Sequence, residues 1–216
     1  MAESDSIIFP MQVVNEDFIQ TEHPPLNIGA IEASLSSNID PFDYQVLSFE
    51  EIPWEQESES YKVLRYCIRV LPLSFATGSM LAGGLLVRAI LGISPGLDVD
   101  IFCYTNKHAE YIKEKFNIKN PDQIRQSRYF KAETIAFSDT LQLQICLVHS
   151  FPALTLSLFP SFHAMIATDG KEVLVHKEAL DCILNKVIKK NPHAQNPVNN
   201  WYEKYEKLGF MEAPNA

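Results

Sequence analysis

The sequence lacks any long apolar run, although apolar residues make up 46% of its 216 positions. No stretch of about 18 apolar residues could form a membrane helix, and no charged and apolar leader follows Met1. The sequence has no Cys-x-x-Cys pair, which argues against a zinc ribbon and a disulfide framework. Its four cysteines are Cys67, Cys103, Cys146 and Cys182. We therefore expect one domain with an appendage, in the cytoplasm or another reducing intracellular compartment, without membrane contact.

Basic residues are missing from the first 61 positions, which hold thirteen Asp and Glu. The formal charge of this stretch is −13, whereas the remainder carries +4 and the whole chain −9. We interpret residues 1–58 as a partly ordered acidic N-terminal extension and residues 59–213 as the folded domain. Two apolar stretches of the extension, 7–9 and 44–47, could dock on this domain, and its acidic charge could bind a protein partner. Sites for anions are expected in the later part.

Hydrophobic periodicity divides the rest of the chain into helices and strands. Pro72 and Gly92 end two of the helical patterns, and Asp169-Gly170 marks the turn of a hairpin. The patterns predict helices at 59–71, 85–91, 108–116, 151–158, 178–190 and 201–208, and strands at 74–82, 97–104, 132–137, 141–148, 163–167 and 172–175.

Two acidic residues, Asp98 and Asp100, lie two positions apart in a predicted strand. Because side chains at this spacing point to the same side of a strand, the two carboxylates repel each other unless a cation lies between them. Magnesium prefers such oxygen ligands. Upstream, Gly83-Gly84 follows a predicted strand and opens a helix, so its bare backbone N–H groups could approach phosphates. Together the two motifs indicate a site for a metal-bound nucleoside triphosphate.

This arrangement resembles the signature of the DNA polymerase β-like nucleotidyltransferase superfamily: Gly83-Gly84, thirteen intervening residues, then Asp98-Val99-Asp100-Ile101. The surrounding residues are similar to those of a compact subgroup seen in large DNA viruses and in ankyrin-repeat proteins of lower eukaryotes. The resemblance spans roughly Tyr61 to Phe210, and its later parts are Thr134-Ile135-Ala136-Phe137, Leu143-Gln144-Ile145, Leu158-Phe159 with Asp169-Gly170, and Lys204-Tyr205 with Gly209-Phe210.

The resemblance implies an α+β fold, a minimal nucleotidyltransferase fold with a small mixed β-sheet flanked by helices. It implies Mg²⁺-dependent transfer of a nucleoside monophosphate from an NTP, with Mn²⁺ as a substitute metal. Asp98 and Asp100 would be the catalytic metal ligands, and Gly83, Gly84 and Arg88 would bind the nucleotide. Each assignment has an alternative: an unoccupied or solvent-facing acidic pair, a glycine pair that permits close packing, and an arginine held in a structural ion pair.

The sequence departs from the family pattern where a third carboxylate is expected. Gln144 occupies the inward position on the neighbouring strand, and Pro160 follows Phe159 where the subgroup has an acid. Glu133 and Asp139 are the nearest substitutes. A second hypothesis is therefore a catalytically degenerate module, a pseudoenzyme that binds or regulates a protein or nucleic acid.

Other polar residues carry weaker signals. Six basic residues lie among aromatic ones and could bind nucleic acid, but the net charge of −9 favours a solvated connection instead. His149, His163 and His176 are interpreted as hydrogen-bonded structural residues. The six basic residues are Lys113, Lys115, Lys119, Arg125, Arg128 and Lys131, and the aromatic residues among them are Tyr111, Phe116, Tyr129 and Phe130.

Overall fold

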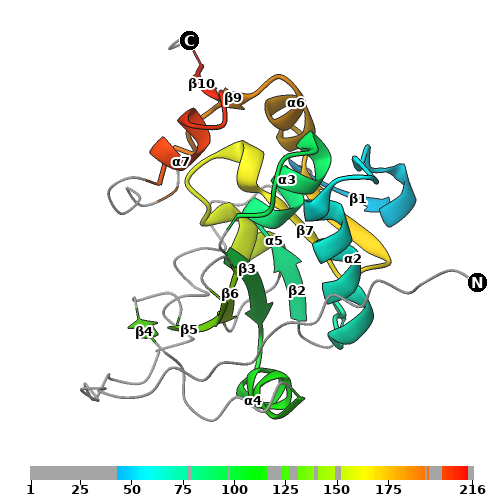
Figure 1. The fold of residues 1–216 in the computed structure, drawn as a ribbon. Coiled ribbons are helices and arrows are strands. Elements are labelled where there is room, and N and C mark those ends of the chain that lie inside the picture. Colours follow the sequence, from blue (N-terminus) through cyan, green and yellow to red (C-terminus); the bar gives the residue numbers. More distant parts are fainter. Residues whose placement is uncertain are drawn as a thin grey trace, which may run out of the picture.

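The structure is a computed structural model that describes residues 43–76, 79–96, 98–115, 123–126, 131–138, 141–148, 152–192, 194 and 201–213. Figure 1 shows the helices and strands in the order of the chain, coloured from the N-terminus to the C-terminus. In chain order the elements are β1 (Tyr44–Ser48), η2 (Phe49–Glu51), α2 (Glu59–Val70), β2 (Ser79–Ala82), α3 (Gly84–Leu91), β3 (Asp98–Cys103), α4 (Asn106–Lys115), β4 (Gln123–Gln126), β5 (Lys131–Ser138), β6 (Leu141–Leu147), α5 (Pro152–Ser157), η3 (Phe162–Ala164), β7 (Ile166–Thr168), β8 (Glu172–His176), α6 (Ala179–Leu184), β9 (Val187–Ile188), α7 (Glu203–Glu206) and β10 (Met211–Glu212).

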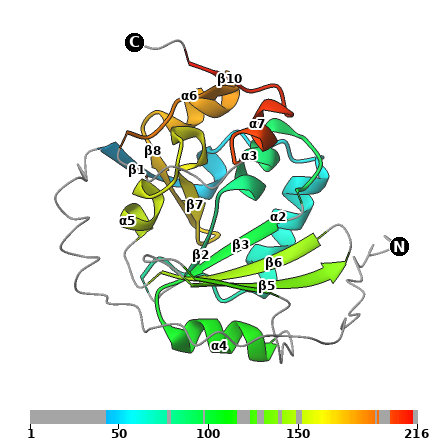
Figure 2. The same cartoon turned by 90° about the vertical axis from the view of Figure 1, so that its left-hand side faces the viewer.

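The main sheet contains eight of these strands in the order β1-β8-β7-β2-β3-β6-β5-β4. Among them β3 and β6 form the one parallel pair, and the other neighbours are antiparallel. A second, two-stranded sheet pairs β9 with β10. Figure 2 shows β2, β3, β6 and β5 running side by side, with α4 on one side of them and α3 and α7 on the other. The fold is therefore a mixed α+β arrangement.

Strand β3 has two chemically different faces. Its buried residues, Val99, Ile101 and Cys103, form the core face, which joins the main apolar cluster with α2 and α3. The alternate residues, Asp98, Asp100 and Phe102, are partly exposed and form the site face. Alternation along a strand places successive side chains on opposite sides of the sheet. One strand thus anchors the core and carries the two acidic residues.

The site face is continued by a smaller apolar cluster. It contains Met80 and Ala82 of β2, Leu156 of α5 and Ala167 of β7, with Phe102 and Phe159 packed against it. The rings of Phe102 and Phe159 have centroids 5.6 Å apart. The site face is therefore apolar toward the end of β3 and acidic toward its start.

Residues 43–58 are part of this fold. Strand β1 pairs with β8, and the Trp54 indole stacks on Phe49 at 4.9 Å and donates a 2.8 Å hydrogen bond to the Phe49 carbonyl. Both aromatic side chains are buried in the main cluster. The stretch 44–47, expected to dock on the domain, lies within an edge strand of the sheet. The other stretch, residues 7–9, lies outside the described residues.

Several predicted elements are shorter than expected. The helix predicted at 178–190 ends at Leu184, because Lys186 adopts a positive φ of 52° and the chain then enters β9. The strand predicted at 74–82 begins at Ser79. The strand predicted at 163–167 begins only at Ile166, as β7, and His163 lies in η3.

Candidate functional site

The turn between β2 and α3, called here the glycine turn, consists of Gly83 and Gly84. Gly83 has φ 81° and ψ −137°, a conformation that residues with a Cβ adopt at a cost of about 1–3 kcal/mol. A Cβ on Gly83 would lie 3.4 Å from Asp100 Oδ2 and 3.6 Å from Phe159 Cε2. The Gly83 carbonyl accepts hydrogen bonds from the N–H groups of Leu86 and Val87, which start α3. The glycine turn therefore brings bare backbone next to one carboxylate.

The sheet register explains why Asp100 meets this turn. Asp100 lies opposite Ala82, the residue that precedes Gly83, in the antiparallel pair β2–β3. Ala82 in turn pairs with Ala167 of β7. Small methyl side chains at both positions leave the carboxylate of Asp100 without a bulky neighbour across two strands. Gly83, Gly84, Asp98 and Asp100 are thus brought together at one end of β2 and β3.

The next strand presents amides to the two acids. In the parallel pair β3–β6, Asp98 lies opposite Gln142 and Asp100 opposite Gln144. Both glutamines are partly exposed, like the aspartates. Gln144 therefore occupies the neighbouring-strand position at which the family resemblance calls for a carboxylate.

Glu133 and Asp139 are the acidic residues that could substitute for that carboxylate. Glu133 pairs with Ile145, one register position away from Gln144, whereas Asp139 lies outside the described residues. Among the residues that the structure describes, no group of three or more His, Cys, Asp and Glu is placed to hold a metal ion. Two carboxylates and two amides are the oxygen donors that the backbone register places together.

The carboxyl group of Asp100 has a perturbed pKa. Its pKa is raised to about 7, mainly by desolvation; the positive charge of Lys204 lowers the pKa and the negative charge of Asp98 raises it. The carboxyl group of Asp100 is desolvated, although the residue as a whole is partly exposed. In this environment the ionised carboxylate is disfavoured, so binding a proton or a nearby cation stabilises the group.

Helix α7 contributes two residues that the sequence analysis did not assign to the site. The Tyr205 hydroxyl oxygen lies 3.8 Å from where a Cβ on Gly84 would be, and Tyr205 is buried. The Lys204 Nζ lies 5.2 Å from the centroid of the Tyr205 ring and 5.4 Å from that of Trp201. A hydroxyl group therefore approaches the glycine turn from a segment more than a hundred residues later in the chain, and an ammonium group lies over the ring that carries it.

Arg88 points toward the loop that follows α3. Its guanidinium Nη1 donates a 2.8 Å hydrogen bond to the Ser94 carbonyl. A Cβ on Gly96 would lie 3.0 Å from Arg88 Nε, so the loop passes directly beside the side chain. In this conformation Arg88 holds the connection that leads into β3.

The Phe159–Pro160 segment borders the glycine turn through the Phe159 ring. The Pro160 carbonyl accepts hydrogen bonds from the Asn191 N–H at 2.8 Å and from the Tyr202 hydroxyl at 3.2 Å. The buried Asn191 amide nitrogen also donates to the carbonyls of Ser157 and Phe159 at 2.7 and 2.9 Å. At Pro160, where the resemblance noted in the sequence calls for an acid, the chain has a backbone turn held by these hydrogen bonds.

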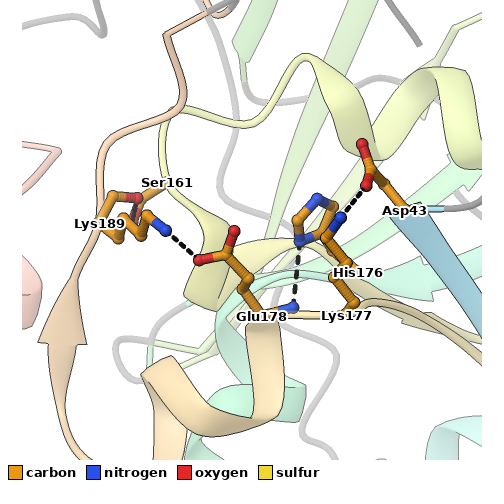
Figure 3. Close-up of polar contacts among 6 residues, drawn as sticks. All are labelled: Asp43, Ser161, His176, Lys177, Glu178 and Lys189. Atoms are coloured by element: carbon orange, nitrogen blue, oxygen red, sulfur yellow. Dashed lines mark hydrogen bonds and ion pairs between the residues drawn. The ribbon is translucent and has the colours of Figure 1, made fainter. Parts of the chain in front are cut away.

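His163 and His176, two of the three histidines interpreted from the sequence as structural, are held by hydrogen bonds and ring contacts. His163 is buried, its Nδ1 lies 2.8 Å from Ser161 Oγ, and burial lowers its pKa to about 3. His176 accepts a hydrogen bond at Nδ1 from the Glu178 N–H, and its ring stacks on Phe162. Figure 3 shows His176 with the neighbouring ion pairs Lys177–Asp43 and Lys189–Glu178. Desolvation lowers the pKa of His176. His149 lies outside the described residues.

Two solved structures have the same arrangement of elements. A Thermotoga maritima CCA-adding enzyme complexed with a tRNA is 16% identical with a TM-score of 0.52, and the match covers 78% of this chain and 43% of that one. A CCA-adding enzyme in complex with CTP is 14% identical with a TM-score of 0.52, and the match covers 78% of this chain and 44% of that one. The fold is that of the nucleotidyltransferases.

Both neighbours are members of the polymerase β-like superfamily, so the expected α+β nucleotidyltransferase fold is confirmed. This chain spans less than half the length of either neighbour. No family model matches the sequence, and no curated protein matches it. Among the described residues, no helix is long and apolar enough to cross a membrane.

Proposed function

We propose that this protein is a nucleotidyltransferase that transfers a nucleoside monophosphate from an NTP to a hydroxyl or phosphate acceptor. The observation behind the proposal is the position of the Asp100 carboxylate, 3.4 Å from where a Cβ on Gly83 would be, within a nucleotidyltransferase fold. Backbone suited to phosphates and a carboxylate suited to a metal thus lie side by side. The CTP complex of one neighbour supports nucleotide binding at this fold.

The metal ligands in this proposal are Asp98 and Asp100, and the metal is Mg²⁺ or Mn²⁺. Their donor set fits a hard divalent cation, because a desolvated carboxyl with a raised pKa and a second carboxyl on the same face both gain from added positive charge. Magnesium is usually held by one or two carboxylates together with water and substrate phosphates. Two aspartates therefore suffice for one such ion, with the amides of Gln142 and Gln144 as neutral neighbours.

In the transfer step, an acceptor oxygen forms a bond to the α-phosphorus of the NTP while the bond to the β-phosphate bridging oxygen breaks. Pyrophosphate leaves with the electron pair of that bond, and the acceptor proton passes to solvent. The N–H groups of the glycine turn and the start of α3 hold the triphosphate. Asp98 and Asp100 would hold the metal ion beside the reacting phosphate. When bound, the metal ion supplies positive charge to the developing negative charge on the phosphate oxygens.

Arg88 is proposed to act at the same site through its remaining donors. Its hydrogen bond to Ser94 uses one N–H of the five that a guanidinium offers. The other N–H groups are available one helical turn beyond the glycine turn for a phosphate oxygen.

A second candidate function is a non-catalytic module that has kept the fold and lost the chemistry. Gln144 opposite Asp100 and the bonded turn at Pro160 favour it, because both positions lack the acid that the family resemblance requires. Such a module would bind a protein partner through the acidic residues 1–58, or bind a nucleic acid.

We further propose an intracellular location and a subgroup for this protein. Four free cysteines are buried, in keeping with an intracellular, reducing compartment. The motifs around Gly83 and Asp98 support assignment to the compact subgroup of large DNA viruses and ankyrin-repeat proteins.

The test is a calorimetric titration of Mg²⁺ with a non-hydrolysable ATP, CTP, GTP or UTP analogue into the full chain. We expect saturable binding by the wild type and loss of at least tenfold in affinity for Asp98→Asn/Asp100→Asn, since charge-assisted contacts contribute about 1.5–3 kcal/mol each. The matched control is Asp181→Asn, an exposed carboxylate on α6.

Three outcomes separate the two candidates. Loss of binding in the double variant alone supports the transferase site. Equal losses in the double variant and in Asp181→Asn would indicate a general charge effect and contradict the site. Absence of binding by a folded wild-type sample with all four nucleotides would favour the non-catalytic module.

A further inference from the structure

We propose that Lys204 and Tyr205 of α7 are triphosphate-binding residues that complete the nucleotide site opposite the aspartate pair. This inference rests on the proposed function, because it assigns two further contacts to the same nucleotide. It concerns a segment that lies more than a hundred residues beyond the glycine turn in the sequence.

The first observation is the position of the Tyr205 hydroxyl. It lies 3.8 Å from the point that a Cβ on Gly84 would occupy, so the hydroxyl oxygen faces the bare backbone of the glycine turn. A phosphate held by the backbone N–H groups of the turn would come within hydrogen-bonding reach of this oxygen, because the two groups border the same space. A tyrosine hydroxyl donates well to an anionic oxygen.

The second observation is how firmly Tyr205 is held. Its ring is buried and packs edge-on against His163 at 4.1 Å and against Phe210 at 5.5 Å. His163 is in turn fixed by Ser161. The Ser161 hydroxyl donates its proton to the Lys189 carbonyl, so the protonated Nδ1 of His163 donates a hydrogen bond to Ser161 Oγ. A hydroxyl on a ring held in this way meets its ligand with little loss of side-chain entropy.

The third observation is the charge next to this hydroxyl. The Lys204 ammonium lies over the rings of Trp201 and Tyr205, and Lys204 is exposed. The Lys204 Nζ lies 5.2 Å from the centroid of the Tyr205 ring, whose hydroxyl faces Gly84. When a metal-bound triphosphate arrives, this exposed ammonium is available to the phosphate oxygens.

The proposed contacts give a role to Lys204 and Tyr205, which take no part in the transfer step described above. Gly84 leaves room for the hydroxyl at the start of α3, and the Trp201–Phe210 segment presents a cation and a donor to one place. The metal ligands and the α7 residues would then hold opposite sides of the triphosphate.

The experiment measures the dissociation constant of Mg²⁺ with a non-hydrolysable ATP analogue for the full chain and for Tyr205→Phe and Lys204→Met. We expect roughly tenfold weaker binding for Tyr205→Phe, which removes one oxygen and keeps the ring, and roughly three- to tenfold weaker binding for Lys204→Met. Tyr44→Phe and Lys207→Met are the matched controls, with an expected change below twofold. Thermal unfolding of each variant verifies that it is folded.

A phosphate series separates contacts to phosphate from contacts to the rest of the nucleotide. The loss in Tyr205→Phe and Lys204→Met should be large for the triphosphate analogue and small for adenosine. An equal loss for both ligands would overturn the assignment.

The remaining outcomes separate this inference from the proposed function. Wild-type affinity in both α7 variants, together with lost binding in Asp98→Asn/Asp100→Asn, would overturn the inference and leave the proposed function standing. No nucleotide binding by the wild type would overturn both.

Discussion

The two faces of β3 differ in what they require from the rest of the chain. The core face needs apolar neighbours on α2 and α3, which are close in sequence and follow plain helical periodicity. The site face needs a backbone conformation at Gly83, an amide on β6 and side chains from α7, which come from distant segments. The packing of the core face thus depends on helices close in sequence, whereas the arrangement of polar groups on the site face depends on the register of the whole sheet.

The largest effect is expected on the core face. Ile101→Ala removes a fully buried side chain, and we expect the free energy of unfolding to fall by about 3 kcal/mol in urea denaturation. Asp98→Ala, three positions earlier on the site face, should change it by less than about 1 kcal/mol. Equal losses in the two variants would show that the faces are not separate in energy.

A substitution pair within the glycine turn sharpens the comparison. Gly83→Ala should destabilise the protein by about 2 kcal/mol, because an alanine pays the cost of φ 81° and its Cβ meets the Asp100 carboxylate. Gly84→Ala lies in the first turn of α3 and should be neutral or raise stability by about 0.5–1 kcal/mol.

Both glycine variants are expected to bind nucleotide more weakly, since either methyl group enters the space of the turn. Thermal unfolding and nucleotide titration on the same samples provide the two measurements. Unchanged nucleotide affinity in the folded Gly84→Ala variant would contradict the role of the glycine turn.

The smallest effect is a pH dependence that originates at Asp100. Its pKa is about 7 in the folded protein and near 3.8 when unfolded, so the folded state binds this proton more tightly. Stability should therefore fall as the pH rises from about 4 to about 7, by about 1–2 kcal/mol once partial exposure is taken into account.

Asp100→Asn should flatten this part of the stability profile, and Mg²⁺ should reduce the fall in the wild type. Denaturation midpoints between pH 4 and pH 8, with and without Mg²⁺, measure both effects. A wild-type profile that rises with pH over this window and responds equally in Asp100→Asn would assign the dependence to other groups.

Sequence reasoning predicted the elements whose signals are local. Helices α2 and α3 and strand β3 follow the expected ranges within one or two residues, because Pro72, the glycine turn and Gly92 mark their ends. The helix predicted at 178–190 was too long, since its lysines continued the amphipathic pattern beyond the left-handed residue Lys186. Strands β4, β9 and β10 were missed, because two to four residues carry no usable periodicity.

The candidate site could be predicted in part. The spacing of Asp98 and Asp100 placed them on one face, and the strand-to-helix position of Gly83-Gly84 placed the turn. Lys204-Tyr205 was noted as part of the family resemblance, but its position beside Gly84 could not be predicted, because that position depends on how α7 packs against His163 and Phe210. The conformation of Arg88 is set by the Ser94 carbonyl, which no pattern indicates.

Strand β1 has a practical consequence for any shortened version of this protein. It covers the edge of β8 along its whole length, from Tyr44 opposite His176 to Ser48 opposite Glu172. A chain that began at Glu59 would leave the N–H and C=O groups of β8 open beside Val173 and Val175, which are buried. Such an uncovered edge invites pairing between molecules. We expect that version to aggregate, whereas one that begins before Asp43 keeps its own edge closed.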